Sequence, residues 1–347
     1  MPTIEELKLY QALPLDLKVE KTKLRVLKWV KTFGVSGVYV SFSGGKDSTV
    51  LLHIVREMFP EVEAVFVDTG LEYPEIRDFV RTFKNVTILR TKMSFKRVIQ
   101  IYGYPIISKE IAGHLYYASK AVAEGRQDQN LDFLKLSGLY LDKNGTKSRF
   151  NFERYKPLLD MPFKIGSYCC SVMKKMPVKR YEAETKRVPI VATMACESNL
   201  RFQKWLKSGC NAFDVKRQIS QPLSFWTEQD ILRYIKENSL KISSVYGEIL
   251  PKEDQLCLDC FSCQEELCTT GCSRTGCIFC GFGVHLEKGE TRFQRLKRTH
   301  PKLYSYCIYG GSYDSDGFWK PDKNGLGMKH VFDELNQIYG DDFIRYE

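Results

Sequence analysis

The chain has 347 residues, of which 43% are hydrophobic, so it can bury a large core and exceeds the length of a typical single domain. Its formal net charge of +10 favours a polyanionic partner, either a nucleic acid or a phosphorylated small molecule, although 52 basic residues spread along the chain are equally consistent with a solvated surface. The sequence has no run of 18 apolar residues and no signal-peptide pattern, so we expect a soluble cytoplasmic protein without a membrane-spanning helix.

The cysteine and histidine content indicates which kinds of metal site the chain can form. The chain has 12 cysteines, and seven of them fall between Cys257 and Cys280. In a chain without a secretion signal, this density indicates metal or iron–sulfur binding rather than disulfides. None of the five histidines forms a pair with zinc-ligand spacing, so we do not expect His-centred hydrolysis.

A glycine-rich turn follows the first predicted strand. Residues 5–33 show mostly helical periodicity, which Gly34 ends, and Val38–Val40 is typical of a short buried strand. Apolar residues then recur at helical spacing over 47–58. The turn between them, Ser41–Ser48, has two adjacent glycines that let the backbone approach a ligand, and the free N–H groups of the next helix carry partial positive charge. The pattern predicts a phosphate-binding loop.

The residues of this loop identify its type. The loop lacks the spacing of a Walker A motif and of the dinucleotide fingerprint G-x-G-x-x-G. The string SGGKDS resembles the pyrophosphatase loop S-G-G-x-D-S of the adenine nucleotide alpha-hydrolase superfamily, which includes ATP pyrophosphatases, tRNA thiolation enzymes and the sulfonucleotide (PAPS and APS) reductases. A Gly-Gly turn in an unrelated α/β protein is the alternative. The resemblance implies that an adenine nucleotide is bound by Ser43, Gly44, Gly45, Lys46, Asp47 and Ser48. It also implies catalytic roles for Lys46 and Asp47.

Strands and helices alternate after the loop. Residues 62–67 and 86–90 are typical of buried strands, and 74–83 of a helix that starts at a proline. This alternation predicts parallel βαβ units, and therefore an α/β fold with a doubly wound parallel sheet and flanking helices.

A second polar turn, Asp68-Thr69-Gly70, follows the second predicted strand. In open parallel sheets the ligand lies beyond the carboxyl ends of the strands, where this turn and the glycine loop both fall. The stretch VDTGLEYPE is similar to the second motif of the sulfonucleotide reductases, which implies nucleotide binding by Asp68, Thr69 and Gly70. A simple turn or helix cap at Asp68 is the alternative.

Residues 125–168 are polar and weakly periodic, so we interpret them as an insertion that could act as a substrate-facing lid. Vicinal cysteines, Cys169 and Cys170, follow it. The stretch from Tyr168 to Val178 resembles the reductase pattern C-C-x-x-R-K-x-x-P-L, although Met173 replaces its arginine and Val178 its leucine. In the APS-type branch, such a pair joins a distant C-x-x-C to hold a [4Fe-4S] cluster. Core packing of two free cysteines is the alternative.

Residues 188–194 form another predicted buried strand, and the polar stretch after it carries Glu197, Ser198 and Arg201. This is similar to the post-strand motif of the same family, in which Glu-Ser and then Arg face the nucleotide. The resemblance implies a catalytic role for Arg201, whose guanidinium can offer bidentate donors to phosphate or sulfate; a surface salt bridge is the alternative. Thr227 and Asp230 have the spacing of a capping box. The resemblance covers about residues 36–247.

In the cysteine block, TGCIFC fits the second cysteine pair of the APS-type branch. The resemblance therefore implies a [4Fe-4S] cluster on Cys169, Cys170, Cys277 and Cys280. The five remaining cysteines could hold a second cluster or a zinc ion: Cys257, Cys260, Cys263, Cys268 and Cys272.

The tail from His285 to Glu347 is rich in aromatic and basic residues, which can stack on and neutralise a single-stranded nucleic acid or can cover the cysteine block. It lacks the E-C-G-[IL]-H sequence that carries the nucleophile of thioredoxin-dependent sulfonucleotide reductases. Cys307 does not have the neighbours of that motif.

These observations predict three regions. Residues 1–35 are an N-terminal helical segment, 36–250 a PP-loop nucleotide-binding α/β domain, and 251–347 a cysteine-rich metal module with its tail. The leading hypothesis is ATP-pyrophosphatase-type activation coupled to sulfur transfer to a nucleic acid, with Mg²⁺ accompanying ATP and a sulfur donor such as a cysteine desulfurase. The alternatives are a PAPS or APS reductase with a displaced nucleophile, and a non-catalytic protein that senses nucleotides or binds nucleic acid.

Overall fold

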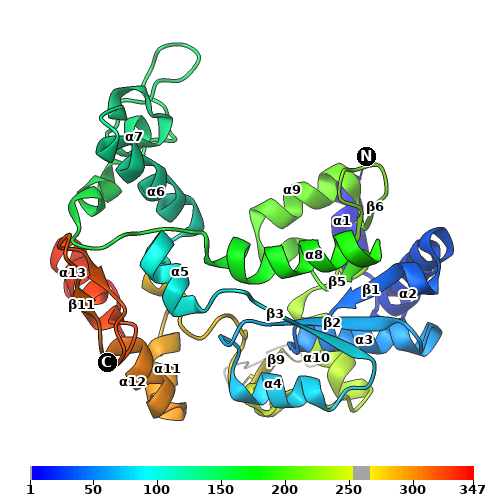
Figure 1. The fold of residues 1–347 in the computed structure, drawn as a ribbon. Helices are drawn as coiled ribbons and strands as arrows, with labels where there is room; N and C mark the ends of the chain where they lie inside the picture. The colour runs from blue at the N-terminus through cyan, green and yellow to red at the C-terminus, as the bar shows by residue number, and fades with distance from the viewer. Residues whose placement is uncertain (1, 253–265) are drawn as a thin grey trace, which may run out of the picture. The chain divides into compact units, whose positions relative to one another are not determined.

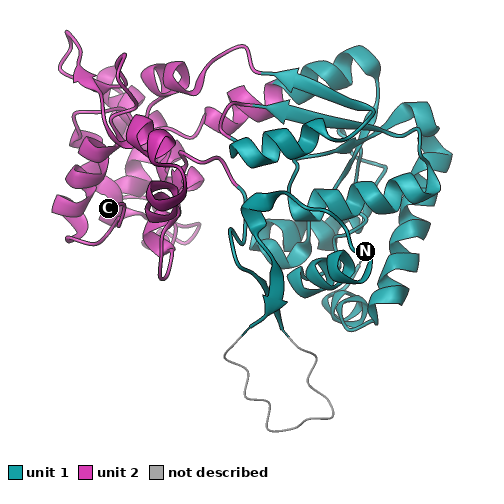
Figure 2. Cartoon of the chain, turned by 90° about the horizontal axis from the view of Figure 1, so that it is seen from below, with its two compact units in different colours: residues 1–68, 72–90, 177–275 teal, residues 69–71, 91–176, 276–347 magenta. Residues whose placement is uncertain are grey.

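The structure is a computed structural model that describes residues 2–252 and 266–347. The chain divides into two compact units, each assembled from separate stretches of sequence (Figure 2). Unit 1 consists of residues 1–68, 72–90 and 177–275, and unit 2 of residues 69–71, 91–176 and 276–347.

Unit 1 is built on a six-stranded sheet with the order β3-β2-β1-β5-β7-β6. Its strands are β1 Val38–Ser41, β2 Glu63–Asp68, β3 Val86–Arg90, β5 Val188–Val191, β6 Asn211–Ala212 and β7 Ile219–Ser220. All neighbouring pairs are parallel except β6 and β7. Val40 of β1 pairs with Ala64 on one side and with Ile190 on the other. The strand order therefore reverses direction at β1, which is the position where open α/β sheets bind ligands.

Helices cover both faces of this sheet. They are α1 Ile4–Gln11, α2 Leu15–Phe33, α3 Lys46–Met58, α4 Pro74–Arg81, α8 Met176–Thr185, α9 Asn199–Ser208 and α10 Glu228–Glu237. Figure 1 shows α3 and α4 on one face and α8 on the other. The predicted doubly wound α/β fold is thus confirmed.

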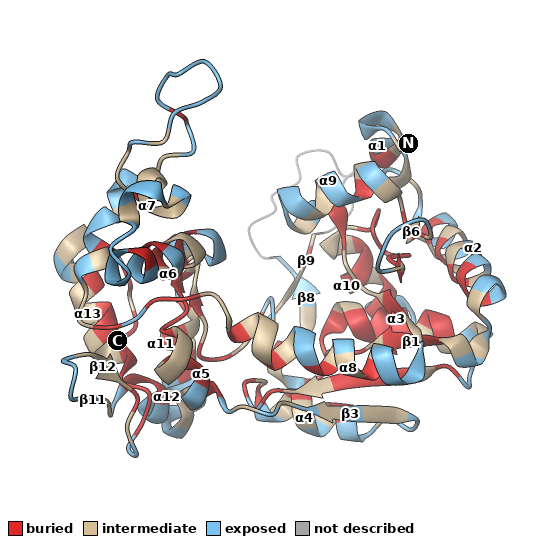
Figure 3. Cartoon of the chain, turned by 45° about the horizontal axis from the view of Figure 1, so that its top comes forward, coloured by how far each residue is buried: buried red, intermediate tan, exposed pale blue. Residues whose placement is uncertain are grey.

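The core of unit 1 lies between β1 and the helices beside it, as the buried residues in Figure 3 show. Val40, Val50 and Ile54 are 0% exposed. The predicted capping box is present at the start of α10, where Thr227 Oγ1 accepts from Asp230 N and Asp230 Oδ2 accepts from Thr227 N. Both oxygens of the Asp230 carboxylate also accept from the Lys18 ammonium, at 2.7 and 2.8 Å, which ties α2 to α10.

Unit 2 contains the other described α-helices and two short two-stranded pairs. Its helices are α5 Phe95–Tyr102, α6 Lys109–Ala123, α7 Leu131–Leu136, α11 Arg292–Thr299, α12 Pro301–Ile308 and α13 Met328–Tyr339. Its strand pairs are β4 Ile106–Ile107 with β10 Gly281–Phe282, and β11 Ser312–Tyr313 with β12 Trp319–Lys320. The parallel pairing of β4 with β10 joins the first half of the chain to its last third.

The third pair is the hairpin of β8 Ile249–Pro251 and β9 Leu267–Thr269 in unit 1. Cys257, Cys260 and Cys263 lie outside the described residues. Among the helices that the structure describes, none is both long enough and apolar enough to cross a membrane.

Candidate nucleotide site and cysteine pocket

The loop Ser43–Ser48 joins the carboxyl end of β1 to the first turn of α3, as the sequence predicts. Hydroxyl groups hold its shape. Ser43 N donates to Ser48 Oγ at 3.2 Å, Gly45 N donates to Ser43 Oγ at 3.3 Å, and Ser48 Oγ donates to Gly45 O at 2.9 Å. Gly44 has a φ of +71°, and a Cβ there would lie 2.7 Å from a methyl group of Val80. Only glycine fits that position without strain.

Two charged residues of the loop differ in their surroundings. The Lys46 side chain is 3% exposed, and its ammonium donates to Ser273 O at 2.7 Å and lies 3.0 Å from a carboxylate oxygen of Glu228. One oxygen of Asp47 is buried without a hydrogen-bond partner. Burial raises the pKa of Asp47, while the charges of Lys46 and Arg274 act in the opposite direction. A cation could stabilise this carboxylate by binding there.

The motif that follows β5 consists of Glu197, Ser198 and Arg201, and it also lies in unit 1. Arg201 forms an ion pair with Glu197, whose carboxylate also accepts from Met194 N at 2.8 Å. Ser198 caps α9 by accepting from Arg201 N at 3.3 Å. Burial lowers the pKa of Arg201, and the charge of Arg274 lowers it further. Glu197 and Ser198 thus position the start of α9, and Arg201 adds positive charge near Asp47.

The sequence analysis did not single out Arg274, Glu228, Tyr246 or Thr275, because their positions depend on contacts between distant stretches. It also missed Cys196, which lies directly before Glu197 and is exposed. Its Sγ donates to Trp226 O at 3.5 Å, and desolvation of the sulfur raises the pKa of the thiol. The sequence signal that could have pointed to Cys196 was its position next to Glu197, a residue of the family motif.

The Asp-Thr-Gly turn spans the boundary between the units. Asp68, in unit 1, ends β2 and accepts from Arg77 at 3.3 Å. Thr69 and Gly70 belong to unit 2, where Thr69 Oγ1 accepts from Leu71 N at 3.2 Å. Gly70 has a φ of +73°. The predicted roles of Asp68, Thr69 and Gly70 in nucleotide binding remain predictions.

Four cysteines from two distant stretches line one small pocket in unit 2. The lining consists of Thr69, Leu71, Phe95, Pro105, Cys169, Cys170, Met173, Lys174, Cys277 and Cys280. Ile278 N donates to Leu71 O at 2.8 Å, which holds the Cys277–Cys280 turn against this part of the chain. A π-helical turn, Ser171–Lys175, follows the vicinal pair, and such turns recur at functional sites.

Cations surround these thiols. The pKa of Cys170 is lowered, first by a hydrogen bond from Cys169 and then by the charges of Lys109 and Lys174. The pKa of Cys169 is raised because it keeps the shared proton. Burial raises the pKa of Cys277 and Cys280, while a hydrogen bond from Lys174 lowers the former and the charge of Arg292 lowers the latter.

The donor set suits a polynuclear cluster. Four thiolates are the usual ligands of a [4Fe-4S] cluster, and the pocket supplies four thiols with compensating cations. Among residues 2–252 and 266–347, no group of three or more His, Cys, Asp or Glu side chains is arranged to hold a metal ion. The predicted cluster on these cysteines therefore remains a prediction.

The other cysteines have separate environments. Cys268, on β9, and Cys272 belong to unit 1, and the other three cysteines of the predicted second site lie outside the described residues, so this site remains a prediction. Cys307 is 0% exposed, and burial raises the pKa of its thiol well above the ordinary value. In this conformation Cys307 cannot reach a substrate.

The aromatic and basic tail is largely occupied by internal contacts. Arg292 donates to Cys280 O at 3.0 Å and pairs with Glu287, while Arg298 pairs with Glu290. Tyr304 is buried. Arg292 thus ties the tail to the Cys277–Cys280 turn, and both roles predicted for the tail remain predictions.

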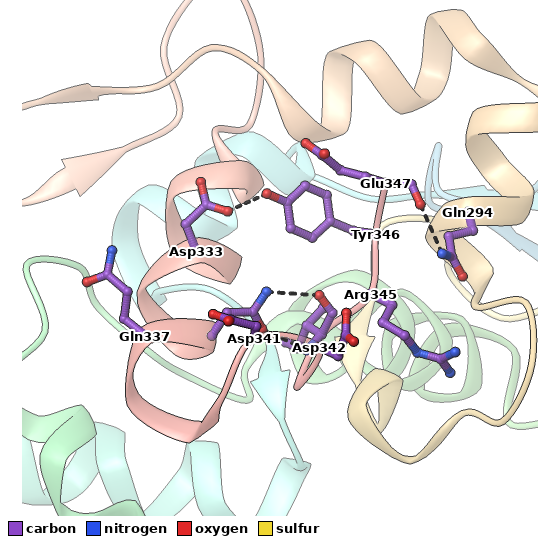
Figure 4. A pocket seen from close by; sticks show the side chains of 10 residues that line it. Gln294, Asp333, Gln337, Asp341, Asp342, Arg345, Tyr346 and Glu347 are labelled. Atoms are coloured by element: carbon purple, nitrogen blue, oxygen red, sulfur yellow. Dashed lines mark hydrogen bonds between the residues drawn. The ribbon is translucent and has the colours of Figure 1, made fainter.

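A larger pocket of about 400 Å³ lies near residue 347, and Figure 4 shows its lining side chains. Carboxylates dominate this lining, including Asp333, Asp341, Asp342 and Glu347. Such a surface repels phosphate, and none of the predicted site residues lies there.

The chain is similar to several known proteins. Residues 37–105 match the family model of the phosphoadenosine phosphosulfate reductase domain. Two uncharacterised proteins of Methanocaldococcus jannaschii are 24% identical over 87% of this chain and 29% identical over 77% of it. The matches cover 57% and 40% of those proteins, so the chain spans about half the length of these relatives. The adenosine 5'-phosphosulfate reductase of Staphylococcus epidermidis is 22% identical over 76% of this chain and 85% of its own length.

Two solved structures show looser likenesses. The phosphoadenylyl-sulfate reductase of Candida auris, in a phosphate complex, gives a TM-score of 0.36 at 15% identity and covers 70% of this chain and 91% of its own. The U34-tRNA thiolase NcsA of Methanococcus maripaludis, with its [4Fe-4S] cluster, gives a TM-score of 0.32 at 17% identity and covers 65% of this chain and 66% of its own. With the loop, the sheet order and the match over residues 37–105, the predicted resemblance to the phosphoadenosine phosphosulfate reductase family is confirmed.

Proposed function

We propose that this chain is a PP-loop enzyme that activates an acceptor with ATP and directs sulfur transfer onto it, with a nucleic acid in the cytoplasm as the acceptor. The observation that carries the proposal is the pocket of four cysteines flanked by Lys109 and Lys174, in a chain that also has a complete S-G-G-x-D-S loop at the switch point of its sheet. The match of residues 37–105 to the phosphoadenosine phosphosulfate reductase domain, a family that includes enzymes, also supports the proposal that this chain is an enzyme.

In the first step, an oxygen of the acceptor attacks the α-phosphorus of ATP, the bond to the bridging oxygen breaks, and pyrophosphate leaves. The hydroxyls of Ser43 and Ser48 and the N–H groups that open α3 bind the departing phosphates. Arg201 and Arg274 offset the charge that develops. Asp47 is the candidate carboxylate for Mg²⁺, because its buried Oδ1 accepts no hydrogen bond from the described residues and has only the Lys46 ammonium, 3.9 Å away, as an ion-pair partner.

In the second step, a hydrosulfide ion attacks the activated carbon and AMP leaves with the electron pair of the broken carbon–oxygen bond. The acceptor thereby exchanges oxygen for sulfur without a change in the oxidation state of the carbon. A persulfide, such as a cysteine desulfurase forms, can deliver the same sulfur if a thiol then reduces the disulfide that results.

Cys169, Cys170, Cys277 and Cys280 would hold the [4Fe-4S] cluster, which can supply electrons or bind sulfide. Lys109, Lys174 and Arg292 compensate the negative charge of the four thiolates. Met173 is 1% exposed and completes the apolar wall that keeps water from this site.

A sulfonucleotide reductase is the second candidate. The match to the S. epidermidis adenosine 5'-phosphosulfate reductase over 85% of its length favours it. Buried Cys307 cannot supply the attacking thiolate, which leaves exposed Cys196 as the candidate nucleophile. Desolvation raises the pKa of the Cys196 thiol and the charge of Arg274 lowers it, so the Arg274 charge would have to favour the thiolate.

Product analysis separates the two. Anaerobically purified protein is incubated with ATP plus a nucleic-acid pool, or with PAPS or APS plus thioredoxin. The proposal expects AMP and pyrophosphate in the first mixture and negligible sulfite in the second. Sulfite release that Cys196→Ser abolishes would instead establish a reductase.

A further inference from the structure

Hydroxyl groups from outside the loop occupy the phosphate cradle of unit 1. The Lys46 N–H, one of the donors that open α3, donates to Tyr246 Oη at 3.1 Å. Tyr246 Oη lies 2.7 Å from Thr275 Oγ1. A Cβ on Gly45 would lie 3.1 Å from that Tyr246 oxygen and 3.4 Å from the Thr275 oxygen, so both hydroxyls close over the loop. Tyr246 is 2% exposed.

The stretch Ser273–Thr275, which we call the strap, is fixed to the loop at a second point. The Lys46 ammonium donates to Ser273 O at 2.7 Å. Just before the strap, Gly271 N donates to Tyr246 O and Cys272 N donates to Val245 O. Backbone hydrogen bonds therefore hold the segment that leads into the strap beside Tyr246. Lys46 contacts both, through its N–H to Tyr246 and through its ammonium to Ser273.

A phosphate would compete for the same donors. An N–H group at the start of a helix needs an acceptor, and an anionic phosphate oxygen is a stronger acceptor than a neutral hydroxyl. Burial raises the pKa of Tyr246 to about 12, so its hydroxyl keeps its proton near neutral pH. Once phosphate accepts from Lys46 N, the Tyr246 and Thr275 hydroxyls can turn their protons toward the phosphate oxygens.

We propose that Tyr246 and Thr275 are phosphate-binding residues of the nucleotide site, and that the strap transmits occupancy of this site to Cys277. This inference rests on one part of the proposed function, namely that the loop binds an adenine nucleotide. Only Gly276 separates Thr275 from Cys277 in the chain, so at most about 7 Å of backbone lies between their Cα atoms. A shift of Thr275 must therefore be absorbed by Gly276 or reach the cysteine pocket.

Linkage makes this coupling measurable from both ends. If bound nucleotide changes the affinity of the cysteine pocket for its metal, bound metal changes the affinity for nucleotide by the same factor. A shift of Thr275 that reaches Cys277 should also change the rate at which a chelator removes iron from the reconstituted protein.

The test compares the full chain with Tyr246→Phe and Thr275→Val, which keep side-chain size and remove one hydroxyl each. Tyr234→Phe is the matched control, since its buried hydroxyl bonds to His53 and not to the loop. ATP and inorganic pyrophosphate are titrated calorimetrically, and iron loss to a chelator is timed with and without each. We expect affinity for both ligands to fall about tenfold in the two variants and to be unchanged in the control. The ligand-dependent change in iron loss should disappear in Thr275→Val.

The outcomes separate the two proposals. Pyrophosphate binding without ATP binding would overturn the proposed function, while the variants still test the strap with pyrophosphate. Equal affinities in all four proteins, or iron loss that ignores bound ligand, would overturn the inference. Absence of binding by both ligands would overturn both proposals.

Discussion

The Lys46 ammonium lies 3.0 Å from a carboxylate oxygen of Glu228, so the lysine of the loop is already paired before any ligand binds. The same ammonium donates to Ser273 O. Lys46 therefore acts first as an anchor between the loop and the strap, and its contribution to catalysis would require it to exchange these partners for phosphate.

Replacing this anchor should destabilise unit 1. Lys46→Met removes the hydrogen bond from the ammonium to Ser273 O, which should cost about 1 kcal/mol of unfolding free energy, since Ser273 is exposed and water can replace the lost donor. Loss of the pair with Glu228 should add little, because that carboxylate is 43% exposed. Urea unfolding followed by tryptophan fluorescence checks this, with exposed Lys31→Met as the control. Equal stability of the two variants would show that the anchor is not needed for folding.

Changes in the glycine loop should weaken nucleotide binding while the fold is retained. Ser48→Ala removes the acceptor for Ser43 N and the donor to Gly45 O, and Gly45→Val pushes a side chain toward the Tyr246 hydroxyl. We expect ATP affinity to fall at least about tenfold, or about 1.4 kcal/mol, by calorimetry. Gly37→Ala is the control, since its Cβ would meet only an ordinary contact at 3.5 Å. Undiminished affinity in both loop variants would place the nucleotide elsewhere.

The ionised carboxylate of Asp47 should lower the free energy of unfolding at neutral pH. Burial raises its pKa in the folded state, so the folded protein binds the proton more tightly than the unfolded chain does. Its ionisation therefore lowers stability as pH rises through the folded pKa, and the effect is absent below the unfolded pKa of about 3.9. We expect Asp47→Asn to be more stable than the wild type at pH 7 and to lose this advantage in acid, while Mg²⁺-dependent ATP binding falls. An advantage that does not vary with pH would contradict this assignment.

The cysteine pocket should assemble only with all of its thiolates. Protein purified anaerobically should contain iron and acid-labile sulfide, and Cys170→Ala and Cys277→Ala should each lose the cluster, because each removes one of four ligands. Cys196→Ala should retain it, since Cys196 lies outside this pocket. Zinc without iron after anaerobic reconstitution would mean that the pocket is a different metal site.

Sequence patterns predicted the helices, strands and turns that are determined by residues close together in the chain. The strand, glycine turn and helix over residues 38–58 follow from apolar spacing, and Gly34 ends α2 with a φ of +77°. The helical periodicity over residues 5–33 hid a break, because Pro14 separates α1 from α2 while the apolar spacing continues across it. The capping box at Thr227 was visible in the sequence because its partner, Asp230, lies within one turn of it.

Features that depend on long-range contacts had no such signal. The two-residue strands β4 and β10 pair across more than half of the chain, and neither is long enough to show alternation. Tyr246 looked like an ordinary aromatic residue, and only the folded chain places its hydroxyl on Lys46 N. The convergence of the two cysteine pairs could be anticipated from the family pattern, but the cations around them could not.

The most direct test of sulfur transfer follows the sulfur atom itself. Anaerobic protein carrying its cluster is mixed with ³⁵S-labelled sulfide, a nucleic-acid pool and ATP, and the label that becomes covalently bound to nucleic acid is counted. The account predicts incorporation that requires ATP, releases AMP and pyrophosphate in proportion, and is lost in Gly45→Val and Cys277→Ala. Incorporation that is independent of ATP, or none in any nucleic acid while sulfite is released from PAPS or APS, would contradict it.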